Sequence, residues 1–174
     1  MKLKDLLHVK GEVLIQSVDS NGIISTVMED KNLIVSNGRN NICNFLTNTN
    51  GSSYIYDIAF GTGGTITGNT NVALSVSPSE VSVIAPITGL VNGTDYLFTA
   101  TPETAPSPRA VFSIIIPATS LPGQTAITAL NGQALSELAL MLNTATPTAF
   151  AIKRFPSISK SSTISLIITW IIYV

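Results

Sequence analysis

The end of the chain decides the fold: residues 164–174 read ISLIITWIIYV, with no charge, no glycine and no proline. β-Branched and aromatic side chains dominate this stretch, which is typical of a β-strand covered by protein. Ile168 and Trp170 fall on one face of that strand at a period of two. The other face is also partly apolar, because it carries Ile167, Ile171 and Tyr173. A strand with two apolar faces needs cover from a second sheet or from another subunit.

The composition supports subunit contact. The chain has 174 residues, of which 45% are hydrophobic and only 11% charged, and its mean hydropathy is +0.40. This length favours one domain with a substantial core. A membrane helix needs about 20 apolar residues in a row, and the apolar run at 164–174 is much shorter. The low charge therefore indicates contact between subunits, and no membrane partner is expected.

The N-terminal segment, residues 1–10, is expected to be an arm outside the domain. It has basic residues but no apolar core of the kind found in a secretory leader, because charges recur at Asp5 and Lys10. We expect this arm to contact a partner protein, and a solvated terminus is the alternative. The residues that we expect to make the contact are Lys2, Lys4, Leu6 and Leu7.

The charge pattern argues against nucleic acid as a partner, since the formal net charge is −1. The charges are nevertheless uneven. Residues 40–108 hold no Lys or Arg, whereas residues 109–174 hold four basic residues and one acid, Glu137. These regions could meet at opposite ends of one sandwich or between neighbouring copies, or the charges could simply be solvated. The only cysteine, Cys43, excludes an internal disulfide and is expected to be a small core residue.

Turn residues divide the chain into short strands. Asn-Gly pairs occur five times, and such pairs between apolar runs mark β-hairpins because both residues tolerate a positive φ. The pair at Asn21-Gly22 separates residues 12–18 from residues 23–29, which predicts a hairpin. Further strands are expected at 32–36, 54–60, 80–87, 95–101, 109–116, 124–130, 135–142 and 148–155.

One short helix interrupts this pattern, at 39–47. Asn37 is expected to cap it, and Ile42, Phe45 and Leu46 would form its apolar stripe. The fold class is therefore mainly β: an antiparallel β-sandwich, jelly-roll-like or immunoglobulin-like, with one α-helix near 38–47 and a single domain over 11–174. Its expected core includes Phe60, Phe112, Phe150 and Trp170.

The residue inventory disfavours catalysis. One histidine, His8, and one cysteine cannot form a zinc site of the usual ligand count, and no Gly-x-Ser-x-Gly sequence occurs. Glu29 and Asp30 are adjacent on an expected strand, so they point to opposite faces. Residues 61–64 read GTGG but lack the Gly-Lys-Ser/Thr of a phosphate loop, and we interpret them as a turn. We therefore expect no enzyme activity, no cofactor and no metal.

Several motifs, in their order along the chain, resemble small virion proteins of tailed bacteriophages. The sequence KNLIVSNG at 31–38 follows the N-terminal hairpin, and IAFGTGG at 58–64 is similar to a strand and glycine turn of those proteins. The close of the chain, FAIKRFPSISK at 150–160 followed by the Trp170 strand, is also similar to theirs. Before that close, residues 135–138 keep an acid, Glu137, but lack the glycine usual in the family.

The resemblance implies a non-enzymatic component of the head surface, neck or tail of a phage particle. Such a protein would be made in the cytoplasm of the host bacterium, and its partners would be copies of itself and other virion proteins. A different class is a fibre or adhesin module that binds host-surface glycans through loops 61–79 and 88–108. For that class, Tyr54, Tyr56 and Tyr96 are the candidate sugar-stacking residues.

Overall fold

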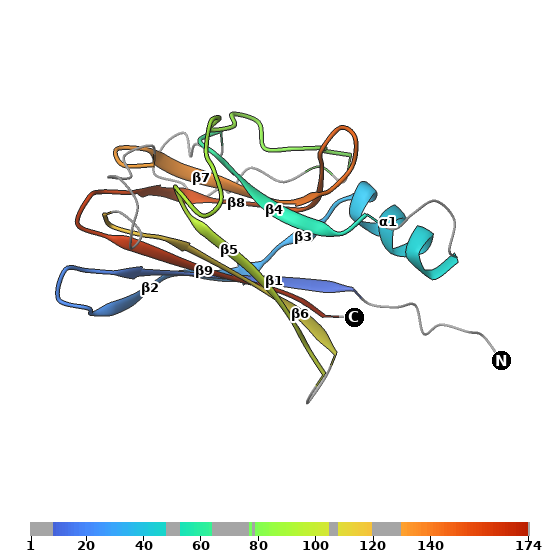
Figure 1. Cartoon of the computed structure of the whole chain (residues 1–174), viewed down its shortest axis with the longest axis horizontal. Helices are drawn as coiled ribbons and strands as arrows, with labels where there is room; N and C mark the ends of the chain where they lie inside the picture. The colour runs from blue at the N-terminus through green and yellow to red at the C-terminus, as the bar shows by residue number, and fades with distance from the viewer. Residues whose placement is uncertain are drawn as a thin grey trace.

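The protein is built from two antiparallel sheets that pack face to face (Figure 1). A computed structural model describes residues 9–47, 53–63, 77, 79–104, 108–119 and 130–173. The first sheet has the strand order β2-β1-β9-β6-β5 and the second has the order β3-β8-β7-β4. The expected antiparallel, mainly β sandwich with one short helix is thereby confirmed.

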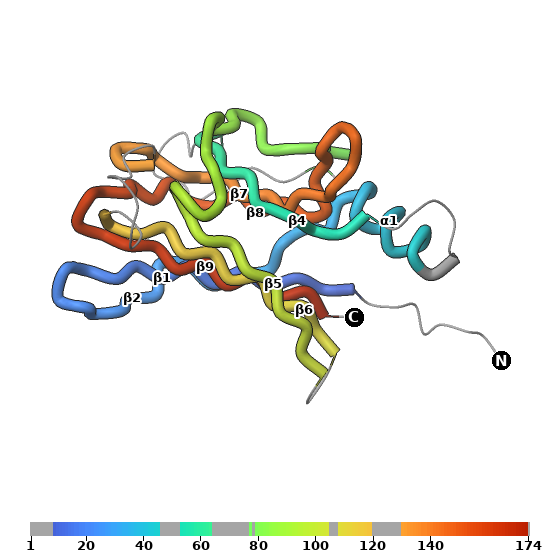
Figure 2. Tube along the Cα trace, viewed as in Figure 1, coloured from blue at the N-terminus to red at the C-terminus, as the bar shows by residue number. Residues whose placement is uncertain are grey.

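The first sheet joins the two ends of the chain. Its strands are β1 (Lys10–Val18), β2 (Ile24–Lys31), β5 (Leu97–Glu103), β6 (Arg109–Ile116) and β9 (Ser165–Tyr173). Figure 2 shows β1, in blue, beside β9, in red, and their register pairs Val13 with Trp170. On its other side β9 pairs with β6, so that Trp170 lies opposite Phe112. The C-terminal strand is therefore the central strand of five.

The second sheet carries the helix and most of the buried charge. Its strands are β3 (Leu33–Ile34), β4 (Ile55–Gly61), β7 (Ala134–Leu142) and β8 (Thr148–Ser159), and α1 (Ser36–Thr47) packs against β8. Residues 31–35 lead the chain from the end of β2 in the first sheet to β3 in the second.

The core lies between the sheets and is filled from both. Val13, Phe112 and Trp170 from the first sheet join Leu138 and Phe150 from the second in one buried cluster. Phe60, another of the aromatic residues expected in the core, meets Tyr96 edge to face with ring centroids 5.0 Å apart. All four expected core residues, Phe60, Phe112, Phe150 and Trp170, are at most 5% exposed.

The prediction of a strand at 80–87 was wrong. This segment contains an isolated bridge between Gly61 and Pro86 but no ladder. Two of its backbone N–H groups, those of Ile84 and Ala85, donate to the side chain of Glu137 instead. A carboxylate therefore takes hydrogen bonds that a neighbouring strand would otherwise accept.

The helix differs from expectation at its start and on its apolar face. It begins at Ser36, so Asn37 lies within it and the pair Asn37-Gly38 is not a turn. A Cβ atom on Gly38 would lie 2.2 Å from the carbonyl oxygen of Phe150, so this glycine allows the helix to approach β8 closely. Phe45 is 67% exposed, and the expected stripe is not buried as a whole. The side chain of Cys43 is also exposed rather than in the core.

Candidate assembly surface

The outer face of the five-stranded sheet is the surface on which sequence reasoning expected subunit contact. Along β9, buried side chains alternate with half-buried ones. Trp170 and its neighbours at even positions point into the core. The half-buried side chains that share the outer face are Ser165, Ile167, Thr169, Ile171 and Tyr173. The structure thus brings the candidate contact residues Ile167, Ile171 and Tyr173 onto one face.

Neighbouring strands extend the apolar character of this face. Ile167 lies between Gln16 of β1 and Ile115 of β6, and Ile115 pairs in turn with Leu97 of the edge strand β5. Ile171 lies beside Val111 of β6. Since cross-strand neighbours on one face touch one another, these side chains form a continuous area. We call it the apolar face, made of Leu14, Leu97, Val111, Ile115, Ile167 and Ile171.

One end of the same face is charged, and opposite charges alternate there. Lys10 and Arg109 flank Tyr173 on either side. The Tyr173 hydroxyl donates to Glu12 Oε2 at 2.9 Å, and this hydrogen bond raises the pKa of the tyrosine. Arg109 Nε donates to Glu103 Oε2 at 2.6 Å, which raises the pKa of the guanidinium. The outer face therefore combines an apolar area with a mixed, neutralised charged end.

The basic C-terminal part and the acidic middle part of the sequence form ion pairs with each other within one chain. Arg109 pairs with Glu103, and Arg154 pairs with Glu80, so basic residues of the C-terminal part meet acids of the middle part. Lys153 pairs with Asp30 across the two sheets. Glu29, in contrast, lies on the outer face opposite Leu14, as expected for adjacent residues on a strand.

Of the other candidate contact residues, Lys2, Lys4, Leu6 and Leu7 lie outside the described residues. Lys10 is the first residue of β1 and pairs with Tyr173. The segment to which these four residues belong therefore joins the fold at the charged end of the outer face.

The far face of the molecule carries a buried carboxylate that sequence reasoning did not single out. Glu137 on β7 is 0% exposed. Its Oε1 accepts a hydrogen bond from Arg154 Nε at 2.7 Å. Its Oε2 accepts from the backbone N–H groups of Gly63, Ile84 and Ala85, at 3.1, 3.0 and 3.2 Å. Glu137 and Arg154 thereby clamp the segment 79–87 onto the four-stranded sheet.

The charged state of Glu137 is favoured by these contacts. Burial alone would raise its pKa, but the hydrogen bonds from Arg154 and from the backbone of Ala85 and Ile84 outweigh burial and lower it. Arg154 also donates to both carboxylate oxygens of Glu80, which anchors the start of the clamped segment. The cluster is paired and enclosed, which is typical of a structural role.

Two glycines of the GTGG sequence, Gly61 and Gly63, are explained by the same carboxylate. A Cβ atom on Gly61 or Gly63 would lie 2.8 or 2.7 Å from Glu137 Oε2. The sequence feature that could have indicated this buried carboxylate is the Gly-x-Gly at the end of an apolar strand. These glycines allow the backbone to approach a side chain that is 74 residues away in the chain.

The three tyrosines that the glycan hypothesis proposed are found in different surroundings. Tyr96 is 1% exposed, and its hydroxyl donates to Asp57 Oδ1 at 2.6 Å, so it is a core residue. Burial, together with Asp57, raises the pKa of Tyr96. Tyr54 is 64% exposed and lines a cleft of about 250 Å³ with Pro102 and Phe112. Tyr56 is 37% exposed, but it lies at the irregularity of β4 between Ile55 and Asp57 and lines a different cleft.

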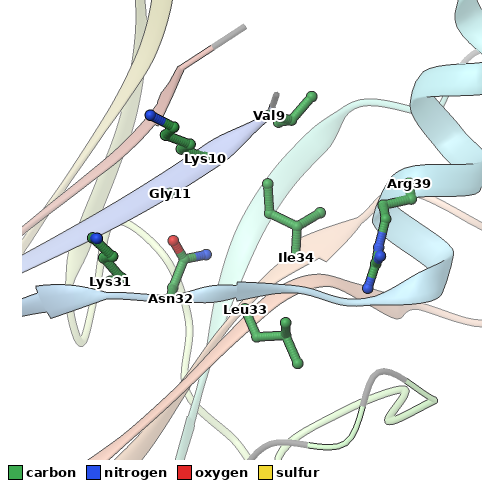
Figure 3. Close-up of a pocket in the computed structure, with 8 residues that line it drawn as sticks. All are labelled: Val9, Lys10, Gly11, Lys31, Asn32, Leu33, Ile34 and Arg39. Carbon is green, nitrogen blue, oxygen red and sulfur yellow. The ribbon is translucent and has the colours of Figure 1, made fainter. Parts of the chain in front are cut away.

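A larger cleft, of about 400 Å³, lies where β1, β3 and α1 meet (Figure 3). Lys10, Lys31 and Arg39 line it, but Figure 3 shows the lysine side chains pointing away from Arg39. Lys10 and Lys31 lie on the outer face, opposite Tyr173 and Glu12. The amide of Asn32 packs over Gly11, where a Cβ atom would lie 1.6 Å from its Oδ1. The cations do not converge, so the cleft has no anion-binding geometry.

Two further classes of feature are not found in the described part of the chain. No group of three or more His, Cys, Asp or Glu residues there is placed to hold a metal ion. Among the same residues, no helix has both the length and the apolar character needed to cross a bilayer.

Comparison of the chain with protein families, with curated proteins and with solved structures finds no match.

Proposed function

We propose that this protein is a non-enzymatic structural component of a tailed-phage particle, at the head surface, neck or tail, which assembles as a symmetric oligomer through apolar strands. The sequence motifs at both ends and in the middle of the chain support the phage assignment. Its partners would be copies of itself and other virion proteins, and its place of function the virion.

The observation that carries the assembly part is the uncovered outer face of the central strand. In a two-sheet sandwich, outward residues are mostly polar because water covers that side. Here Ile167 and Ile171 of β9 point outward, next to Ile115 and Val111 of β6. Burying such side chains against another subunit stabilises an assembly by about 25 cal/mol per Å² of apolar surface.

The experiment is size-exclusion chromatography with light scattering, followed by incorporation into particles assembled from the other virion proteins. We expect a mass that is a multiple of the 18.3 kDa chain and co-purification with particles. A monomer at every concentration that never joins particles would contradict the proposal.

A second candidate function, glycan binding, is favoured by Tyr54 alone. An exposed aromatic ring beside an apolar cleft is a common platform for a sugar, and Tyr54 has that setting with Pro102 and Phe112. Binding of the wild-type protein to a glycan array, lost in Tyr54→Ala and kept in Tyr56→Ala, would support this function. No binding by the wild-type protein would exclude it for the glycans tested.

A further inference from the structure

The two edges of the five-stranded sheet are poorly suited to pairing with another chain. In β2 the register to β1 shifts between Ile15 and Gln16, which leaves Val27 as the extra residue of a bulge. The same strand ends in three charged residues, 29–31. At the other edge, β5 contains Pro102, which has no N–H to donate. Bulges, charges and proline are devices that prevent edge-to-edge association.

The edges of the four-stranded sheet are also poorly suited to such pairing. The C-terminal end of β4 is covered by the segment 85–87, since Ile87 N donates to Phe60 O at 2.8 Å and Thr62 N donates to Ala85 O at 3.0 Å. The opposite edge strand, β3, has only two residues, and the part of β8 that it leaves unpaired includes Pro156, which has no N–H to donate. Very short edge strands offer too few hydrogen bonds to hold a partner strand.

The outer face of the four-stranded sheet is covered by the chain itself. Val83, in the segment clamped by Glu137, packs against Ala139 and Met141 of β7. Within the described residues, the outer face of the five-stranded sheet is thus the one broad β surface that no other element covers (Figure 1).

The size of this face suits a second copy. Five strands about 4.8 Å apart and about eight residues long at 3.3 Å each give a flat footprint of roughly 600 Å². Two copies would then bury about 1,200 Å² together. The true area is larger because the surface of projecting side chains is not flat, so it reaches the range of specific interfaces.

The charge of the face also suits a copy of itself. Its basic residues are Lys10, Lys31 and Arg109, and its acidic residues are Glu12, Glu29 and Glu103. Three cations and three carboxylates give no net charge. A polyanion or an anionic lipid surface would require an excess of positive charge, whereas a surface of alternating signs is complementary to another copy of itself.

We propose that a second copy of this chain binds face to face on the outer face of the five-stranded sheet, with β9 over β9 and the two-fold axis near Thr169. This inference rests on the proposed function and names the partner and the surface. β9 is the central strand, and Thr169 is the middle one of its five outward residues. A two-fold axis brings the same residue of both copies together. Thr169 therefore meets its counterpart, and the apolar face of one copy covers that of the other.

The test uses single cysteines in a Cys43→Ser background, because the native Cys43 is itself exposed. Thr169→Cys places a thiol at the proposed axis. Thr88→Cys is the matched control, since Thr88 is exposed and lies beside Ile87, against β4 of the other sheet. Each variant is treated with a short bismaleimide and analysed on a denaturing gel, while light scattering gives the mass of the untreated sample.

We expect a cross-linked dimer for Thr169→Cys and little for Thr88→Cys. An oligomer by light scattering in which Thr169→Cys cross-links no better than the control would overturn this inference and leave the proposed assembly intact. A monomer by light scattering for the Cys43→Ser parent and for the wild-type chain would overturn both.

Discussion

At the scale of single residues, the side chains that hold the fold together are charged as well as apolar. Glu137 and Arg154 are almost completely buried and form an ion pair. Glu137 also accepts hydrogen bonds from backbone N–H groups of two separate segments. A buried ion pair is costly to break, because one partner then remains charged without compensation.

Glu137→Gln should therefore lower the free energy of unfolding by about 3 kcal/mol. The amide keeps the shape but removes the buried negative charge, which leaves Arg154 with only Glu80 as a counterion among the described residues. Its single oxygen can accept from Arg154 or from the backbone of Gly63, Ile84 and Ala85, but not from both. Urea unfolding at neutral pH measures the change. Glu12→Gln, at the exposed end of the outer face, is the matched control and should cost less than about 1 kcal/mol. Equal losses in both variants would contradict the role given to the clamp.

The same residue predicts a dependence on pH. Because the pKa of Glu137 is lower in the folded than in the unfolded chain, its contribution to stability is present above the unfolded pKa and is lost as the pH falls through the folded one. The wild-type protein should lose stability on acidification more steeply than Glu137→Gln does. Urea midpoints measured between neutral and acidic pH would show it, and parallel curves would count against it.

Lys160 predicts an effect in the alkaline range. It is 1% exposed, its Nζ donates to Asn131 Oδ1 and to the Ser161 carbonyl, and burial lowers its pKa from 10.5 to about 8. At this position the unfolded chain therefore binds more protons than the folded one between these two pH values, so the contribution of Lys160 to stability should rise from pH 8 towards 10.5. Lys160→Met should remove this rise, while Lys31→Met, at an exposed lysine, should keep it. Thermal unfolding across that range is the measurement.

At the scale of elements, period-two patterns predicted most strands correctly. The prediction failed where the backbone makes hydrogen bonds to residues far away in the sequence. Four predicted elements lie close to their expected bounds: the C-terminal strand, the first hairpin and the strands at 109–116 and 135–142. Their residues alternate between apolar and polar or are continuously apolar, as expected for strands that are buried in a sheet. The segment 80–87 has a similar composition, but the N–H groups of Ile84 and Ala85 donate to Glu137. The local sequence does not tell whether a backbone N–H group will donate to a neighbouring strand or to a distant side chain.

The helix illustrates the same limit. Asn37-Gly38 has the sequence of a turn, yet its glycine serves the close approach of α1 to the Phe150 carbonyl. Of the candidate contact residues, the outward position of Ile167, Ile171 and Tyr173 followed from period two once Trp170 was assigned to the core. The position of Val111 and Ile115 beside them could be predicted only with the strand order, which cannot be read from the sequence.

The two faces of β9 predict opposite outcomes for two substitutions. Trp170→Asp should abolish folding, because it removes a fully buried ring from the core and buries a charge, a combined cost of the same order as the 5–15 kcal/mol stability of a typical domain. Tyr173→Asp should fold and mainly weaken assembly, since the tyrosine lies on the outer face beside Glu12. Circular dichroism and light scattering separate the two effects. Soluble, assembled Trp170→Asp protein would show that the faces are assigned wrongly.

At the scale of the whole molecule, one broad β surface is left uncovered by the described residues, the outer face of the five-stranded sheet. Proline, a bulge and a two-residue strand make the edges unfavourable for pairing, and a clamped segment covers one outer face. The remaining face is apolar in its centre and neutral at its charged end. This arrangement explains why a chain with so few charges would need a second subunit. It also leaves the outer face available for the assembly that we propose.

The most direct test of this account is the molar mass of Thr169→Glu in solution, measured by light scattering beside the wild-type chain and Thr88→Glu. Thr169 is half-buried on the outer face, so glutamate can be accommodated in the folded monomer. In the assembly a two-fold axis would set two carboxylates against each other, and like charges juxtaposed at an interface cost several kcal/mol. We expect that wild type and Thr88→Glu remain oligomeric while Thr169→Glu becomes a folded monomer of 18.3 kDa. A Thr169→Glu protein with the same oligomeric mass as the wild type would contradict it.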